Sequence, residues 1–151
     1  MPIFPTTLDR LIADRKISTK VLALIQHRLP DAIDEVLRQG VAHRPPKPSD
    51  IAIADDESDL KFNPVGTQSA KEEDDVFAYG QILQQVLAAS PTRIGHLNKV
   101  AEACTTTNPE ERISDFASLR LAIERQSSNA IYASIIAVIL CSCALLAWLS
   151  N

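Results

Sequence analysis

The residues that could take part in phosphate chemistry gather in one short loop in the first third of the chain. The loop reads His-Arg-Pro-Pro-Lys-Pro-Ser-Asp over residues 43–50, and the apolar run 51–54 follows it. Transfer of a phosphoryl group requires one side chain that positions the incoming hydroxyl and a carboxylate that holds the metal ion. Asp50 is the only carboxylate of the loop, and the ring of a proline such as Pro45 can perform neither task. The loop therefore gathers charged side chains around prolines that can take no part in such chemistry.

The loop resembles the catalytic loop of eukaryotic-type Ser/Thr protein kinases, which reads His-Arg-Asp-Leu-Lys-Pro-x-Asn before an apolar strand. The matching positions are His43, Arg44, Lys47, Pro48 and Ile51. The resemblance places Pro45 where kinases have the catalytic Asp, and Asp50 where they have the metal-binding Asn. It implies a kinase-like frame in which His43, Arg44, Lys47 and Asp50 are remnants, with no catalytic residue, no bound metal and no cofactor.

Three further stretches follow in the order that kinases have. Where the family has the metal-binding Asp-Phe-Gly, this chain has residues 64–66, Pro-Val-Gly, so only the glycine matches. Residues 74–80 resemble the Asp-Val-Tyr-Ser-Phe-Gly opening of the central helix of the kinase lower lobe, with Asp75 and Gly80 at matching positions. The resemblance implies that Asp75 accepts hydrogen bonds from the backbone of the 43–50 loop. An ordinary helix N-cap is the alternative role for Asp75, and both roles are structural.

The third stretch, residues 104–114, resembles the kinase pattern Cys-x-x-x-(Asp/Asn)-Pro-x-x-Arg-Pro-(Ser/Thr), with Arg112 as its arginine. In kinases this arginine pairs with the Glu of an Ala-Pro-Glu motif, which the chain lacks. Arg112 is therefore expected to pair with another acid or to lie exposed.

Hydrophobic spacing predicts a mainly helical fold with one short β-hairpin. Helices are expected near residues 8–12 with a threonine cap, from 17 to 37, from 75 to 87, near 94–104 and after Ser114 as the cap. Pro30 should kink or split the second helix, and Gly40 should follow its end. Strands are expected at 51–54 and 60–62. The acidic run between them, 55–59, reads as a solvated turn rather than a cation site.

The chain divides into a degenerate kinase-like lower lobe over residues 1–126, a polar spacer over 127–129 and a transmembrane helix over 130–149. The last segment contains no charged residue, and its 20 residues cover about 30 Å as a helix. Tyr132 and Trp148 stand near its ends, where aromatic side chains favour the membrane interface. Because Arg120 and Arg125 precede it and no basic residue follows, the N-terminal domain is expected in the cytoplasm of a tail-anchored, single-pass protein.

Composition excludes several classes of function. A net charge of −4 without a visible basic face argues against a nucleic-acid partner. The three cysteines form no disulfide or zinc pattern, and Cys104 is expected to be a core residue. No spacing of acids or histidines predicts a metal site.

The expected function is that of a catalytically inactive, membrane-tethered kinase-like module (a pseudokinase) that binds another protein. The surface that an upper lobe would cover is expected to expose apolar side chains and invite that partner. The alternative is half of a composite Ser/Thr protein kinase, whose upper lobe comes from another chain or from missing upstream sequence. A third interpretation is a decayed gene fragment.

Overall fold

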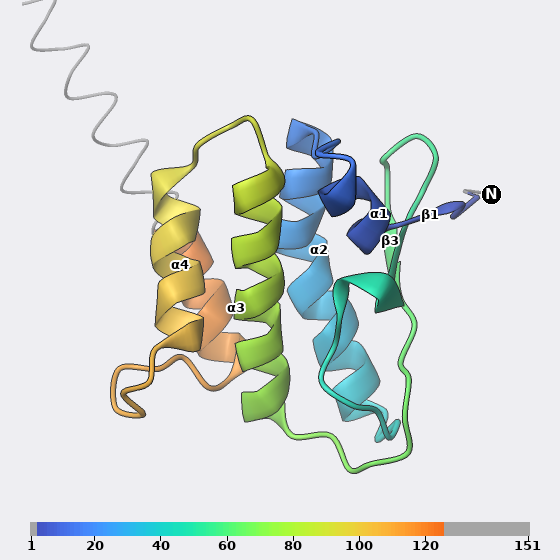
Figure 1. Ribbon diagram of the computed structural model, residues 1–151. Helices are drawn as coiled ribbons and strands as arrows, with labels where there is room; N and C mark the ends of the chain where they lie inside the picture. The colour runs from blue at the N-terminus through green and yellow to red at the C-terminus, as the bar shows by residue number, and fades with distance from the viewer. Residues whose placement is uncertain (1–2, 126–151) are drawn as a thin grey trace, which may run out of the picture.

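Among the described residues the longest helix is α2, which packs against α3 on one side and against β3 on the other (Figure 1). The computed structural model describes residues 3–125, and within them α2 spans Thr19–Arg38. Ser18 caps the helix, since its Oγ accepts a hydrogen bond from the backbone N–H of Val21 at 3.1 Å. The helix is continuous through Pro30, so the expected split does not occur. An internal proline costs a helix about 3 kcal/mol, and burial of Pro30 with its neighbours Leu29 and Ile33 offsets that cost.

The end of α2 confirms the prediction for Gly40. This glycine has a φ of +69°, a left-handed conformation that only glycine adopts without strain. Its N–H donates to the carbonyl of Leu37 at 3.0 Å, and the N–H of Val41 donates to the carbonyl of Val36 at 3.3 Å. This pair of bonds is the Schellman motif, which satisfies the last carbonyls of the helix and turns the chain into the 43–50 loop.

The predicted hairpin is confirmed, and the structure adds a third strand to it. β2 (Ile51–Ile53) and β3 (Leu60–Phe62) pair antiparallel, and β1 (Thr6–Thr7) pairs antiparallel with the other edge of β2. The short helix α1 (Leu8–Ala13) follows β1 at once. Thr7 occupies the N-cap position of α1, but its side chain makes no capping bond, because the residue is already engaged as a strand.

The acidic run 55–59 forms the turn between β2 and β3, as predicted. Two contacts hold the turn against α2: the Oγ of Ser18 donates to Glu57 at 2.6 Å, and Arg28 pairs with Asp59 at 3.4 Å. Glu57 has a φ of +55°, which the tight turn requires. Residues 3–125 contain no group of three or more His, Cys, Asp or Glu side chains placed to hold a metal ion.

The second half of the fold is helical. α3 spans Glu72–Ala89, α4 spans Gly95–Thr105, and residues 116–125 form a further helix, drawn in orange behind α4 in Figure 1. Asp115, not Ser114, caps this last helix, since its Oδ1 accepts from the N–H of Ser118 at 2.7 Å. A carboxylate one residue closer to the helix reaches the free N–H groups of its first turn.

A mainly helical fold with a small antiparallel sheet is thus confirmed. The spacer 127–129 and the predicted membrane segment 130–149 lie outside the described residues. Among residues 3–125, no helix combines the length and the apolar character that crossing a membrane requires.

Gly80 sets the distance between α3 and α4. A Cβ atom at this position would lie 2.5 Å from the Cβ of Cys104 and 2.8 Å from the Cγ2 of Thr105, both side chains of α4. Real Cβ atoms do not approach so closely, so any larger residue would push the two helices apart. The helices therefore pack backbone against backbone at this point.

We expect Gly80→Ala to destabilise the protein by about 1–3 kcal/mol through overpacking, although alanine favours helices. Urea unfolding of the 151-residue chain, followed by circular dichroism, measures this change. Gly95→Ala is the matched control, because a Cβ there meets nothing within 4 Å. Equal stability of the two variants would contradict the close helix contact.

Candidate functional site

The 43–50 loop lies between the end of α2 and β2, and its first residue is fixed inside the protein. His43 is fully buried, and its Nδ1 lies 2.8 Å from the carbonyl oxygen of Val41. Its Nε2 lies 3.0 Å from the Oδ2 of Asp75, in the first turn of α3. The ring also meets the edge of Phe62 from β3, with centroids 5.6 Å apart. His43 therefore connects the loop to a helix and to the sheet.

Asp75 contacts the 43–50 loop at the side chain of His43, and not at the loop's backbone N–H groups. The backbone hydrogen bonds that the kinase resemblance implies are not its contacts, and its partner is the ring of His43. Asp75 is also not the N-cap of α3, a position that Lys71 occupies. Its second oxygen, Oδ1, is buried without a hydrogen-bond partner among the described residues. The carboxylate thus anchors one histidine and satisfies none of the loop's N–H groups.

The proton arrangement of the buried pair follows from its acceptors. A carbonyl oxygen only accepts, so Nδ1 of His43 carries a hydrogen that it donates to Val41. The Nε2 to Oδ2 contact then needs one proton between the ring and Asp75. Burial raises the pKa of Asp75, while the charge and hydrogen bond of His43 act in the opposite direction and the nearby acids Asp74 and Glu72 raise it further. The net effect is a raised pKa of the Asp75 carboxyl, with burial as the largest cause.

The second anchor of the loop is an ion pair within it. Arg44 donates from Nη1 to Oδ2 of Asp50 at 2.7 Å and from Nη2 to Oδ1 at 2.8 Å. The backbone N–H of Lys47 also donates to Asp50 at 2.9 Å. Asp50 is buried, and both of its oxygens are engaged. Both oxygens of the loop's one carboxylate therefore accept hydrogen bonds from other residues of the loop.

Pro45 and Lys47 also belong to the loop, and the side chain of neither contacts Asp50. The carbonyl of Pro45 accepts from Arg44 at 3.2 Å, which closes the loop further. Lys47 is exposed, and its ammonium group has no partner within residues 3–125. An open pocket of about 470 Å³ lies beside it, lined also by Pro46, Ser49 and polar side chains of α3. Of the predicted remnants, the structure brings the side chains of Arg44 and Asp50 together, whereas the side chain of Lys47 lies apart from them.

The segment after β3 supports the loop from behind. Val65 accepts a hydrogen bond from the backbone N–H of Arg44 at 2.8 Å. Gly66 has a φ of +113°, and a Cβ there would lie 3.0 Å from the backbone nitrogen of Arg44. Gly66 thus allows a close approach of the two backbones. Asn63, directly after β3, donates its backbone N–H to the carbonyl of Asp50 at 2.8 Å.

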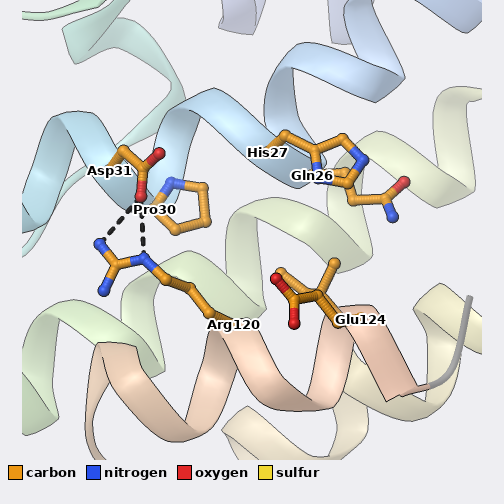
Figure 2. Close-up of a pocket in the computed structure, with 7 residues that line it drawn as sticks. Gln26, His27, Pro30, Asp31, Arg120 and Glu124 are labelled. Carbon is orange, nitrogen blue, oxygen red and sulfur yellow. Dashed lines mark hydrogen bonds and ion pairs between the residues drawn. The ribbon is translucent and has the colours of Figure 1, made fainter.

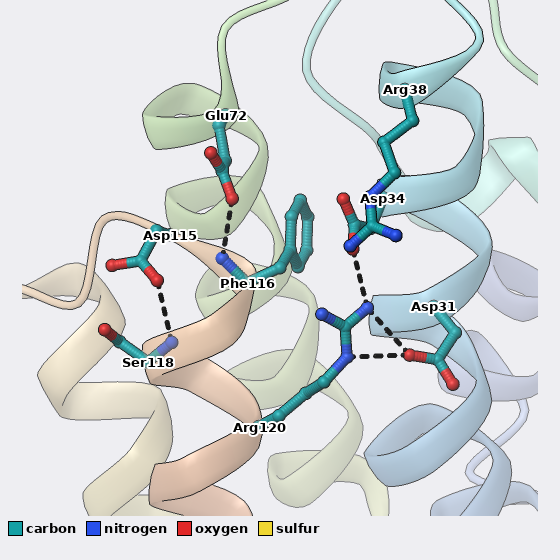
Figure 3. A network of polar contacts seen from close by, with 8 residues as sticks. All are labelled: Asp31, Asp34, Arg38, Glu72, Asp115, Phe116, Ser118 and Arg120. Carbon is teal, nitrogen blue, oxygen red and sulfur yellow. Dashed lines mark hydrogen bonds and ion pairs between the residues drawn. The ribbon is translucent and has the colours of Figure 1, made fainter.

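Arg112 finds its partner in the first turn of α3, where its guanidinium pairs with Glu73. The neighbouring Glu72 accepts from the backbone N–H of Phe116 at 2.8 Å and so fixes the start of the last helix (Figure 3). Of the two expected outcomes, pairing with another acid is therefore the one observed. Cys104 lies buried behind this contact, and burial raises the pKa of its thiol to about 12, which suits a core residue.

Sequence reasoning missed a second ion-pair network, which joins the last helix to α2 (Figure 3). Asp34 is buried and accepts from both Arg38 and Arg120 at 2.7 Å, and Arg120 also donates to Asp31 at 2.9 Å. These carboxylates raise the pKa of Arg120, and the hydrogen bond to Asp34 has the largest effect. Only the Asp34–Arg38 pair, four residues apart on one helix, has a local signal in the sequence.

A small pocket of about 160 Å³ adjoins this network (Figure 2). It lies between α2 and the last helix, and Gln26, His27 and Pro30 line it on the α2 side. Arg120 reaches across it to Asp31. Two of the charged groups that line the pocket, Arg120 and Asp31, pair with each other.

We expect Asp75→Asn to remove part of the pH dependence of stability. A raised carboxyl pKa adds stability that is complete below the unfolded value of about 3.9 and is lost as the pH rises through the folded value. The wild-type free energy of unfolding, relative to Asp75→Asn, should therefore fall from pH 4 toward pH 8. Chemical denaturation across this range measures it. Asp55→Asn, an exposed change in the 55–59 turn, is the control, and a parallel pH profile for wild type and Asp75→Asn would refute the assignment.

We expect Arg44→Ala to destabilise the protein by about 1–3 kcal/mol, because it leaves the buried Asp50 without its charge partner. Arg44→Lys should restore little, since an ammonium group cannot make the paired contact to both oxygens. Lys47→Ala, in the same loop but exposed, should change stability by less than about 0.5 kcal/mol. Thermal unfolding of the three variants measures the order, and an equal loss in Arg44→Ala and Lys47→Ala would speak against the anchor.

Two comparisons with known proteins found no match. No protein-family model matches the chain, and no curated protein matches it. The functional assignment rests on the 43–50 loop, its two anchors and the motifs in the sequence.

Proposed function

We propose that the chain is a catalytically inactive, kinase-like module that is held at a membrane by residues 130–149 and acts by binding another protein. Its described part, on the cytoplasmic side, corresponds in this proposal to a degenerate lower lobe of a Ser/Thr protein kinase. The order of elements supports the correspondence: two helices, the His-Arg loop, a hairpin and three further helices.

The observation that carries the proposal is the internal pairing of Asp50. Its two oxygens accept from Arg44 and from the N–H of Lys47, so a metal ion would have to displace a buried ion pair. Pro45 supplies no group that accepts a proton from a substrate hydroxyl. Both features support a loop that has a structural role and carries out no phosphoryl transfer.

Exposed apolar residues behind the loop support a protein partner. Val41 is 39% exposed and Val65 is 47% exposed, and both contribute a carbonyl to the loop's hydrogen bonds. Apolar side chains at a rigid loop lose little conformational freedom when a partner covers them. These exposed side chains favour the surface around the loop as a place for binding.

The test is affinity capture of the tagged chain from detergent-solubilised membranes, followed by a phosphorylation assay on the captured complex with MgATP. We expect a protein partner whose capture weakens in the double variant Val41→Ser, Val65→Ser, and no phosphate transfer above background. Lys61→Ser, an exposed change on β3, is the matched control.

Two results would contradict the proposal. Phosphate transfer that disappears with Asp50→Ala would favour a composite kinase whose upper lobe another chain supplies. Extraction of the chain by alkaline carbonate without detergent would show that residues 130–149 do not anchor it.

A further inference from the structure

The two ends of α3 carry opposite charge. Its first turn contains four acids, Glu72, Glu73, Asp74 and Asp75. From residue 76 to residue 101 the sequence has no Asp or Glu, and its basic side chains are Arg93, His96 and Lys99. Arg93 lies in the turn between α3 and α4, and His96 and Lys99 lie in the first half of α4. In a chain of net charge −4, this turn is a local basic surface.

The basic groups of the turn are free to meet a partner. Arg93 and Lys99 are exposed, and neither makes an ion pair or hydrogen bond within the described residues. Two other basic residues toward this end of the molecule have acidic neighbours: Lys16 pairs with Asp14 at 3.6 Å, and Lys20 lowers the pKa of Asp56. On the segment of Arg93 and Lys99 the nearest acid is Glu102, one helical turn after Lys99 and farther from the α3–α4 turn.

The last helix runs toward the same end of the molecule. It starts beside Glu72, which accepts from Phe116, and it reaches Gln26 and His27 in the first half of α2 by residue 124 (Figure 1). It thus runs in the same direction as α3. The eighteen residues of α3 rise about 27 Å and the ten of the described last helix about 15 Å, so the α3–α4 turn stands roughly 12 Å beyond residue 125.

The length of the spacer brings this turn to the membrane surface. Residues 126–129 can span at most about 14 Å before the uncharged segment begins at residue 130. This distance matches the height of the turn above residue 125. A bilayer that receives residues 130–149 would therefore have the α3–α4 turn at the level of its headgroups.

We propose that Arg93, in the turn between α3 and α4, and Lys99, in the second turn of α4, form a contact surface for anionic lipid headgroups, which fixes the orientation of the domain on the membrane. The inference rests on the proposed membrane anchor. Phosphate and carboxylate groups of anionic lipids attract Lys and Arg side chains that lie within a Debye length of the surface. The acidic first turn of α3, at the opposite end, would then face away from the bilayer.

Lysine footprinting of the whole chain tests the proposal. The chain is reconstituted into vesicles of phosphatidylcholine, alone or mixed with phosphatidylserine, and flotation first establishes that it stays with the vesicles. Acetylation of each lysine is then followed by mass spectrometry. We expect Lys99 to react at least about threefold more slowly on the anionic vesicles than on the neutral ones, and high salt to remove the difference. Lys71, at the start of α3, should react equally on both.

Arg93→Glu should abolish most of the protection of Lys99, whereas Lys61→Glu, an exposed change on β3, should leave it intact. A chain that floats with both kinds of vesicle but shows equal Lys99 reactivity on them would overturn the lipid contact and leave the anchor standing. A chain that does not float would overturn the anchor, and the lipid contact with it.

Discussion

The hydrogen bond between His43 and Asp75 is the contact on which the loop region depends. It is fully enclosed, and it joins a residue next to the end of α2 to the first turn of α3, 32 positions later in the chain. Burying a carboxylate and an imidazole together is favourable only when their polar atoms find partners. His43 satisfies both of its ring nitrogens, whereas Asp75 leaves one oxygen without a partner. The geometry of the pair therefore fixes the start of the loop, and the remaining loop contacts build on it.

The charged groups of this fold serve mainly to hold its parts together. Asp50 fixes the loop through Arg44, Glu73 fixes Arg112, and Asp34 joins two arginines from different helices. In each case the carboxylate that a ligand or metal would need is already paired with a guanidinium group. The pairs of Asp50 and Asp34 are costly to separate, because each separation leaves a buried carboxylate without its partner. The pair of Glu73 is exposed and contributes less. This pattern gives the Arg and Asp side chains of the 43–50 loop a structural role.

Local patterns in the sequence were enough to predict the helices, the hairpin and the glycine after α2. Each of these follows from spacing within one segment, such as the apolar period of α2 or the φ that Gly40 must adopt. The strand β1 was not predicted, because two threonines have no alternating pattern and pair only where β2 offers an edge. Arg120 is 86 residues from Asp34 and 89 residues from Asp31 in the sequence, so no local pattern indicates these ion pairs. The position of Asp75 near the loop was expected from the kinase resemblance alone, and its partner within the loop was not.

The shared carboxylate of Asp34 has a mechanical consequence. The last helix lies alongside α2 and is held to the core by the guanidinium of Arg120 and by the buried side chains Phe116, Leu119 and Ile123. A force applied at residue 125 along the helix axis loads these contacts in shear, all at the same time, instead of breaking them one after another. Tension on the end of the chain would therefore reach α2 directly, and the module would respond to it as one body.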